Sequence, residues 1–438
     1  MGLLIQILTF VLIISILVVL HEFGHYLPAK WFKIKVEKFY LFFDWKFSLF
    51  KKKIGETEWG IGWLPLGGYV KIAGMIDESM DTEQMKEEPK DWEFRSKPAW
   101  QRLIVMLGGV TVNFFLAWFI YIGLLTVNGD TYIPADSLAH GILVDSIGEK
   151  IGLRTGDQIL AIDGKKAKKF TDAQLDILLG DDITVRRDGQ EKTFPIPPEA
   201  LADVLATQGR NFLTFRRKAL IDQVTEGKPA ALAGMKPGDQ IVAVNDKKIE
   251  FWNDFVREIS NASGESLNIS VDRNGSLEKI QLEVSKDSTI GVGVSRVDLE
   301  VTDEYSFLAA IPAGFNETIE VLTKQVRQFK IIFNTKTKGY KAVKGPIGIV
   351  TIMPEVWNWG FFWGFLAMFS VWLAFVNLLP IPALDGGHVM FLLYEIISGR
   401  PASEKVLERG QIVGFVIVMG LMAVVFGNDI WNLIKDFF

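Results

Sequence analysis

The sequence predicts a polytopic α-helical membrane protein with four transmembrane helices, a membrane-associated β-hairpin and two inserted α+β domains of one type. Two observations lead to this fold class: uncharged apolar runs stand near both ends of the 438-residue chain, and a polar middle section repeats itself. The overall hydrophobic fraction of 49% is therefore an average over two different parts. The formal net charge of −5 is too near balance to indicate a basic stripe, so we expect no nucleic-acid partner.

The four predicted spans are runs without a charged residue. The first, Met1–Leu20, has the roughly 20 apolar residues that cross a bilayer core of about 30 Å. A cleaved signal peptide would need a basic start and a small-residue cleavage site, and neither is present. Three more runs follow: Leu103–Val127, Val356–Leu384, and the shorter Ile412–Phe426, which Asp429–Phe438 can extend. The apolar stretch Val389–Leu393 is too short to cross and predicts an interfacial helix.

Basic residues determine the expected orientation of the spans. Eight lysines follow the first span between Lys30 and Lys53, and Arg400, Lys405 and Arg409 lie between the third span and the fourth. By the positive-inside rule, segments 27–102 and 386–411 face the cytoplasm and the polar middle section faces outward. Four lysines between 336 and 344 would lie on the outward side, against this rule. They do not change the expected orientation, because long loops translocate largely regardless of their charge.

The polar middle section contains a duplicated domain. The tetrapeptide Gly-Asp-Gln-Ile of 156–159 recurs at 238–241, and an alternating apolar strand begins there in each copy. These segments resemble circularly permuted bacterial PDZ domains, which we place at 128–220 and 221–300. The resemblance implies grooves that bind peptide termini by strand addition. The alternative is that the pair acts only as a spacer or a size filter.

The inner end of the first span carries an H-E-x-x-H motif, His21-Glu22-Phe-Gly-His25. On a helix, two histidines four residues apart lie on one face and can bind one metal ion, with Glu22 beside them as a candidate general base. Polar anchoring of a helix end explains one such side chain but explains three at zinc spacing poorly. Ionisable groups in a membrane span are costly and are by default a functional hypothesis.

A catalytic zinc ion usually needs a third protein ligand. The chain has no cysteine and only four histidines, so the candidates are few. His140 lies in the outward section, on the wrong side of the membrane. Asp385 and His388 both lie near the inner end of the third span. Pro380 and Pro382 break helical hydrogen bonding there, which is tolerated where the backbone lines a cavity in the protein. On this reasoning both residues remain candidates.

The motif in the first span, together with the N-x-x-P-x-P-x-x-D-G pattern that begins at Asn377, resembles the site-2 protease family of intramembrane zinc metalloproteases. The resemblance covers nearly the whole chain. It implies that His21, His25 and Asp385 bind Zn²⁺ and that Glu22 activates the attacking water. His388 then becomes a supporting residue.

The same resemblance implies that Asn377 contacts the substrate backbone and that Pro380 and Pro382 shape the loop presenting Asp385. It implies regulated intramembrane proteolysis of single-pass membrane proteins, such as anti-sigma factor-like proteins and remnant signal peptides. It further implies an enzyme of the inner (plasma) membrane, embedded in the lipid bilayer, with periplasmic PDZ domains and an active site near the cytoplasmic side.

Two segments complete the expected domain organisation, beside the helical parts at 1–127 and 351–438. Residues 36–74 alternate apolar and polar positions in parts, which predicts one or more β-hairpins at the membrane interface. We expect an edge near Gly60, Ile61 and Gly62 to bind an unwound substrate by strand addition, the alternative being a membrane-anchoring hairpin. Residues 301–350 contain apolar residues at helical spacing among charges, which predicts an amphipathic connector that helps to gate access.

Two other function classes compete with a protease. A membrane scaffold would use the PDZ pair to bind peptides, and a metal transporter would use histidine and aspartate side chains along a pathway. Glu22 distinguishes them, because a scaffold has no use for it. A transporter would place its ligands along a pore rather than at one depth.

Overall fold

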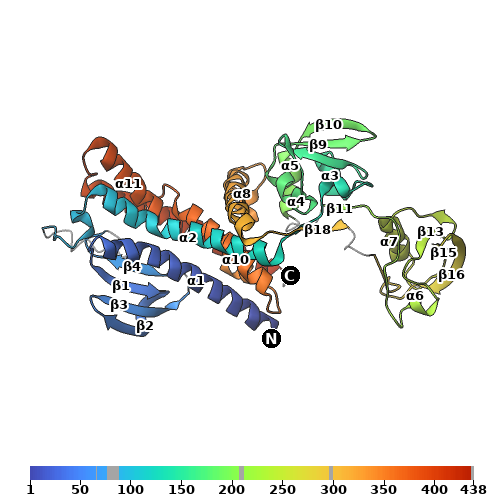
Figure 1. Cartoon of the computed structure of the whole chain (residues 1–438), viewed down its shortest axis with the longest axis horizontal. Helices are drawn as coiled ribbons and strands as arrows, with labels where there is room; N and C mark the ends of the chain where they lie inside the picture. Colours follow the sequence, from blue (N-terminus) through green and yellow to red (C-terminus); the bar gives the residue numbers. More distant parts are fainter. Residues whose placement is uncertain (66, 76–87, 207–211, 295–298, 436–438) are drawn as a thin grey trace. The chain divides into compact units, whose positions relative to one another are not determined.

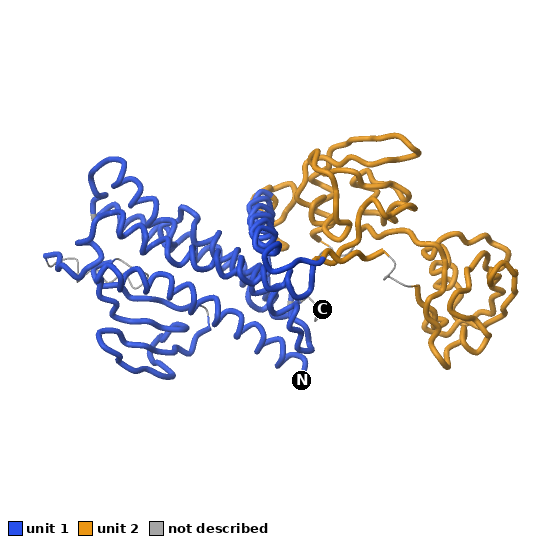
Figure 2. The backbone as a smooth tube through the Cα atoms, in the orientation of Figure 1, with its two compact units in different colours: residues 1–129, 304–330, 343–438 blue, residues 130–303, 331–342 orange. Residues whose placement is uncertain are grey.

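The computed structural model describes residues 1–65, 67–75, 88–206, 212–294 and 299–435. Its fold divides into two compact units (Figure 2). Unit 1 comprises residues 1–129, 304–330 and 343–438, and unit 2 comprises residues 130–303 and 331–342. Unit 1 therefore brings both apolar ends of the chain together, and unit 2 contains the repeated section.

Within the described residues, unit 1 contains four helices long and apolar enough to cross a membrane. They are α1 (Gly2–Trp31), α2 (Ala99–Asn128), α10 (Trp359–Asn377) and α12 (Glu404–Lys435) (Figure 1). The chain is thus a multi-pass membrane protein, as predicted. The third span ends at Asn377 rather than at Leu384, because Pro380 and Pro382 cannot continue the helix. The fourth is longer than predicted, with an apolar window within Lys405–Asn432.

Helix α2 is central to unit 1 and contacts α1, α10 and α11 (Asp385–Ser398). Helix α8 (Phe307–Phe333) packs on the same core: Phe315 contacts Trp118 of α2, and Phe329 contacts Phe375 of α10. The predicted amphipathic connector therefore lies against the membrane-spanning helices. Its role in gating stays a prediction.

A buried carboxylate joins α12 to the segment that precedes α10. Asp429 of α12 accepts hydrogen bonds from the backbone N–H groups of Gly345, Ile347 and Gly348 at 2.8–3.0 Å. These groups belong to the start of the short helix α9 (Pro346–Val350), whose first N–H groups have no partner within the helix. Asp429 therefore satisfies three backbone donors that would be costly to leave unpaired in an apolar environment.

Residues 36–72 form a four-stranded sheet, where the sequence suggested one or more hairpins. Its strands are β1 (Val36–Leu41), β2 (Phe43–Ile54), β3 (Thr57–Leu64) and β4 (Tyr69–Ile72), in the order β2-β3-β1-β4. Among these four strands, β2 and β3 form an antiparallel hairpin, and β3 also pairs with β1 in parallel. The sheet lies beside α1, which both β1 and β4 contact (Figure 1).

The prediction of a free strand edge at Gly60, Ile61 and Gly62 is wrong. Gly60 pairs with Tyr40 of β1 on one side and with Lys51 of β2 on the other, so β3 is an interior strand. A side chain at Gly60 would overlap the ring of Tyr40, and one at Gly62 would overlap the backbone at Phe42 and Phe43. These glycines allow close packing inside the sheet. Among the described residues, the strands at the edges of this sheet, where strand addition could occur, are β2 and β4.

Unit 2 contains two lobes with separate cores. The first-lobe core runs from Ile133 to Leu213 around the sheet β10-β9-β7-β8, and the second-lobe core runs from Ala219 to Ile290 around the sheet β14-β13-β15-β16. The strands are β5 (Asp130–Tyr132), β6 (Ile142–Val144), β7 (Gln158–Ile162), β8 (Lys165–Lys166), β9 (Asp182–Arg187), β10 (Gln190–Pro195), β11 (Leu213–Phe215), β12 (Gln223–Val224), β13 (Gln240–Val244), β14 (Lys247–Lys248), β15 (Ser266–Arg273), β16 (Ser276–Glu283), β17 (Val292–Gly293) and β18 (Val301–Asp303). The helices are α3 (Ser146–Ile151), α4 (Phe170–Leu179), α5 (Pro198–Ala206), α6 (Pro229–Leu232) and α7 (Trp252–Asn261).

The two lobes repeat each other in detail. Strands β7, β8 and β9 of the first lobe correspond to β13, β14 and β15 of the second, with the same antiparallel pairing. A register shift falls between Ile159 and Ala161 in one lobe and between Ile241 and Ala243 in the other. Helices α4 and α7, ten residues each, follow at corresponding places. The lobes are therefore copies of one α+β fold, and their assignment as PDZ domains stays a prediction.

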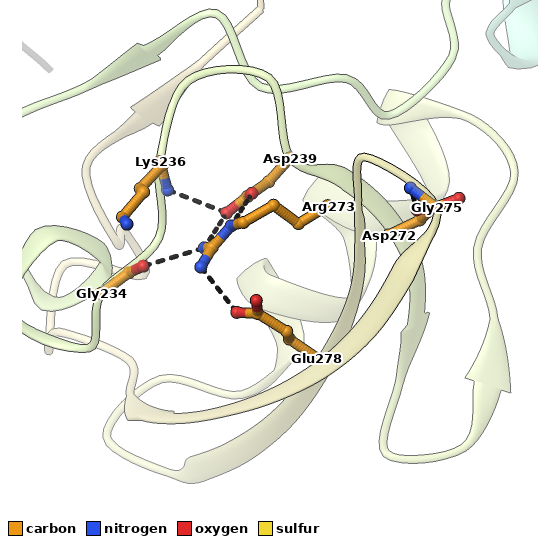
Figure 3. A network of polar contacts seen from close by, with 7 residues as sticks. All are labelled: Gly234, Lys236, Asp239, Asp272, Arg273, Gly275 and Glu278. Carbon is orange, nitrogen blue, oxygen red and sulfur yellow. Dashed lines mark hydrogen bonds and ion pairs between the residues drawn. The ribbon is translucent and has the colours of Figure 1, made fainter.

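Each lobe also buries the same ion pair. In the second lobe, Arg273 donates two hydrogen bonds to the buried carboxylate of Asp239 and a third to the carbonyl of Gly234 (Figure 3). In the first lobe, Arg187 makes the same contacts with Asp157 and Gly152. The backbone N–H three residues before each aspartate completes the network at 2.8 Å. A bidentate, fully hydrogen-bonded pair of this kind tolerates burial.

We predict that Asp239→Asn destabilises the second lobe by about 1–3 kcal/mol, because the neutral amide cannot accept both charge-assisted hydrogen bonds from Arg273, which keeps only its ion pair with Glu278. Burial alone would raise the pKa of Asp239, but the hydrogen bonds from Arg273 and from the Lys236 N–H lower it below its ordinary value. The ion pair therefore stabilises the lobe above about pH 4 and stops doing so as the pH falls below that value.

Hydrogen–deuterium exchange of the full chain measures this effect: exchange in β13–β16 should accelerate, while β7–β10 serve as an internal standard. Glu278→Gln is the matched control, because Glu278 contacts the same guanidinium from a 43% exposed position. Unchanged exchange in Asp239→Asn would contradict a stabilising role for the pair.

Candidate metal centre

Three side chains from distant parts of unit 1 place their ligand atoms together. His21 and His25 lie in α1, four residues apart and thus on one helix face, and both are buried. Asp385 is the first residue of α11, where the helix dipole favours a carboxylate. Their ligand atoms all lie within 4.8 Å of one another. A metal ion could therefore bind all three at once.

The separations of these atoms suit zinc. His21 Nε2 and His25 Nε2 are 3.3 Å apart, and they lie 3.4 and 3.3 Å from Asp385 Oδ2. A tetrahedral zinc ion with bonds of about 2.0–2.1 Å separates its ligands by about 3.3–3.4 Å. Asp385 Oδ2 is buried and accepts no hydrogen bond from the described residues. An orphaned carboxylate oxygen facing two imidazole nitrogens fits a cation between them.

Helix α2 orients both histidine rings. The carbonyl oxygen of Val105 lies 2.8 Å from His25 Nδ1, and the side-chain amide of Asn113 lies 3.1 Å from His21 Nδ1. A carbonyl can only accept, so Nδ1 of His25 carries its proton and Nε2 is free to bind a metal. Partners of this kind, beyond the ligands themselves, set ring orientation and basicity at metal sites.

Gly109 makes room for the two rings. It lies midway between Val105 and Asn113, four residues from each, and so shares their face of α2. A side chain here would overlap His25 Nε2 and would place its first carbon 2.6 Å from His21 Cε1. At Gly108, the residue directly before Gly109, the backbones of Gly24 and Gly108 lie so close that a side chain at either would overlap the other's carbonyl group. The α1–α2 contact at this depth is therefore made by backbone.

The other predicted site residues occupy different positions around this cluster. Glu22 follows His21 directly, is partly buried, and its carboxylate accepts no hydrogen bond from the described residues. Asn377, the last residue of α10, places its amide nitrogen 3.2 Å from His21 Nε2. His388 lies in the first turn of α11 but does not belong to the group of ligand atoms.

The segment between α10 and α11 brings Asp385 to the histidines. Pro380 is exposed, whereas Pro382 lies so close to Gly410 and Gly414 of α12 that a side chain at Gly414 would contact its carbonyl. Short backbone hydrogen bonds close the loop, including the Ala383 N–H to the carbonyl of Ile381 at 2.9 Å. Pro382 thus anchors the loop against α12.

The remaining predicted residues lie elsewhere. Gly60, Ile61 and Gly62 belong to β3, and the close neighbours of the two glycines are Tyr40, Phe42 and Phe43 rather than the metal ligands. His140 is in unit 2, where its ring contacts Phe251 at a centroid distance of 5.4 Å.

Sequence reasoning missed Gly109 and Asn113. The available signal was an amide side chain, Asn113, in the middle of a span without charged residues, four residues after a glycine. The absence of charge predicts the span Leu103–Val127 but does not single out Asn113 within it.

Comparisons with known proteins agree on one family. The chain matches peptidase family M50 over residues 9–421. It is 29% identical over 456 residues to a Neisseria meningitidis protein whose name describes it as a zinc metalloprotease, with 98% of this chain and 99% of the relative covered. It is 29% identical to the regulator of sigma E protease of Haemophilus influenzae and 28% identical to the regulator of sigma-E protease RseP of Escherichia coli. Each of these two alignments covers 97% of this chain and 98% of the relative.

We predict that Gly109→Ala weakens zinc binding by about 10–100-fold, because the added carbon displaces both imidazole rings. Zinc content after dialysis against a graded series of chelator concentrations measures the loss. Gly123→Ala is the matched control: it lies in the same helix, and a side chain there meets nothing within 4 Å. Equal zinc retention in the two variants would show that the space at Gly109 is not needed.

Proposed function

We propose that this chain, which belongs to peptidase family M50, cleaves single-pass membrane proteins inside the membrane. The family and the named relatives make it a zinc-dependent metalloprotease, in agreement with the enzyme class and cofactor that the sequence implied. The observation that carries the proposal is the assembly of His21, His25 and the orphaned oxygen of Asp385 on membrane-spanning helices and at their ends.

We assign His21, His25 and Asp385 as the residues that hold zinc. When bound, zinc lowers the pKa of a water molecule to about 7 and polarises the scissile carbonyl. Glu22 is the general base: it takes the proton of the attacking water and returns it to the amine that leaves. Its sequence position beside His21 and its carboxylate, free of hydrogen bonds within the described residues, support this role.

Asn377 is proposed to hold the substrate backbone. Its amide lies beside His21 Nε2, so a peptide bond that reaches the ligand cluster also comes within reach of this side chain. An amide can donate to a substrate carbonyl and accept from a substrate N–H. Pro380 and Pro382 shape the loop that carries Asp385, and the packing of Pro382 against α12 supports this assignment.

An intramembrane substrate must be unwound before it is cut, because a helix keeps its peptide groups in internal hydrogen bonds. We propose that the unwound segment adds to the free edge of β4. This edge is near the ligands: Gly68, just before β4, lies so close to Val18 that a side chain on it would meet Val18 Cγ1 at 2.5 Å, and Val18 is three residues before His21. Gly60, Ile61 and Gly62 would then support the sheet from inside.

The substrate class is proposed from the relatives. Two of them are named regulators of sigma-E, which supports a membrane-bound, anti-sigma factor-like substrate for this chain, with remnant signal peptides as a second class. The distribution of lysine and arginine supports an inner-membrane location with the two lobes on the periplasmic side and the ligand cluster nearer the cytoplasm. The lobes would bind peptide termini or exclude bulky substrates.

The other two function classes fit the site less well. A peptide-binding scaffold needs neither an orphaned carboxylate nor paired imidazoles. A transporter needs ligands at successive depths, whereas His21, His25 and Asp385 form one cluster. Both classes leave the position of Glu22 beside the cluster without a role.

We predict that Glu22→Gln lowers cleavage of a model transmembrane substrate by about 10²–10⁴-fold while zinc stays bound, because the amide cannot take up a proton. Cleavage is followed by gel electrophoresis in reconstituted bilayers, and zinc by elemental analysis. Glu56→Gln, a 65% exposed position, is the control. Persistent cleavage by zinc-loaded Glu22→Gln would remove the proposed general base.

We predict that Val70→Pro in β4 abolishes cleavage with zinc retained. The Ala73 N–H donates to Lys35, so by alternation the Val70 N–H points away from β1 and is available to a substrate strand. Proline removes this donor. The control is Val70→Ala, which loses side-chain packing but keeps the N–H. Equal cleavage by the two variants would exclude strand addition at β4.

A further inference from the structure

We propose that Asn113 is a positioning residue that selects the tautomer of His21 whose Nε2 can bind the metal. The inference rests on the proposed zinc site. It adds a residue on α2 that touches neither the metal nor the substrate and acts through His21.

Asn113 is held in one place by contacts on two sides. It is fully buried in α2, and its side-chain amide lies 3.1 Å from His21 Nδ1. Its backbone carbonyl accepts a hydrogen bond of 2.8 Å from the hydroxyl of Ser370 in α10, which is itself fully buried. Helix α10 thus fixes the stretch of α2 from which the amide reaches His21.

The geometry of the ligand cluster decides which end of the amide faces the ring. His21 Nε2 lies 3.3 Å from His25 Nε2 and 3.4 Å from Asp385 Oδ2, so Nε2 is the nitrogen that binds the ion. A neutral imidazole that binds through Nε2 carries its proton on Nδ1 and needs an acceptor there. In the structure the amide nitrogen of Asn113 faces Nδ1 at this distance, and its oxygen is buried without a hydrogen-bond partner among the described residues. With the NH₂ group in this place, Nδ1 would accept and Nε2 would carry the proton. A rotation of the amide by 180° exchanges its two ends, so that the otherwise unpartnered oxygen accepts from Nδ1–H, and this is the orientation that metal binding through Nε2 requires.

The partner of His25 supports the same logic. Val105 offers a backbone carbonyl, which can only accept, and so fixes His25 in the metal-binding tautomer. Val105 and Asn113 lie eight residues apart, two turns of α2, with Gly109 between them on the same face. One face of α2 therefore provides an acceptor for each histidine and the space for both rings.

A purely structural role does not account for the amide. Leucine has the same number and branching of side-chain heavy atoms as asparagine and is an ordinary residue in an apolar span, whereas a buried amide costs free energy unless it is hydrogen-bonded. The carbonyl that Ser370 contacts belongs to the backbone, so that link would survive replacement of the side chain. What the side chain alone provides is the contact with His21.

The test compares Asn113→Leu, which has no acceptor, with Asn113→Asp, which restores one. Zinc affinity is measured by competition with a chelator, and the tautomer of His21 by ¹⁵N NMR of zinc-free protein labelled at histidine, where four rings give few signals. We expect Asn113→Leu to bind zinc about 10–100-fold more weakly and to lose the Nδ1-protonated signal of His21. Asn113→Asp should recover both.

Two controls separate the possible failures. Ser370→Ala perturbs the same contact between α2 and α10 without touching His21, and it should leave the tautomer unchanged; an equal loss of zinc affinity in Ser370→Ala and Asn113→Leu would overturn the proposal in favour of packing. His21→Ala tests the site itself. If His21→Ala loses zinc but Asn113→Leu keeps both its affinity and its tautomer, the inference about Asn113 fails alone. If His21→Ala keeps its zinc affinity, the proposed site fails.

Discussion

The close contact between α1 and α2 is the constraint on which the rest of unit 1 depends. Gly24 and Gly108 bring the two backbones together without intervening side chains. This proximity lets α2 place a carbonyl and an amide against the outer nitrogens of His21 and His25. Both Nε2 atoms then face Asp385. The proposed metal site thus depends on the absence of side chains at one helix crossing.

Three polar side chains of unit 1 lie where a partner or a proposed function accounts for them. Asp429 accepts hydrogen bonds from three backbone N–H groups, and the hydroxyl of Ser370 donates to a backbone carbonyl of α2. Asp385 lies at a helix N-terminus. The non-helical backbone before Asp385 also leaves fewer polar groups unpaired, because Pro380 and Pro382 lack the N–H groups that an apolar environment would leave unsatisfied. The loop can therefore leave the helical path at membrane depth.

The sequence predicted what depends on local pattern. Four spans, the spacing of His21 and His25, and the repeat at 156–159 and 238–241 all follow from short-range periodicity, and the third and fourth spans differ only at their ends. The sheet could not be predicted, because alternation is the same in a hairpin and in a parallel pair; the placement of β3 between β1 and β2 depends on non-local packing of Gly60 against Tyr40. Asn113 was missed because its significance depends on which helix it faces.

The buried ion pairs of the two lobes bear on how the chain evolved. Every group in the first network lies between Gly152 and Arg187, and every group in the second between Gly234 and Glu278. A gene segment that encodes one lobe therefore encodes its complete stabilising network. A newly duplicated copy would have carried this network whole, without compensating changes in its neighbour. Each copy could then diverge in the surface it presents while its interior stayed the same.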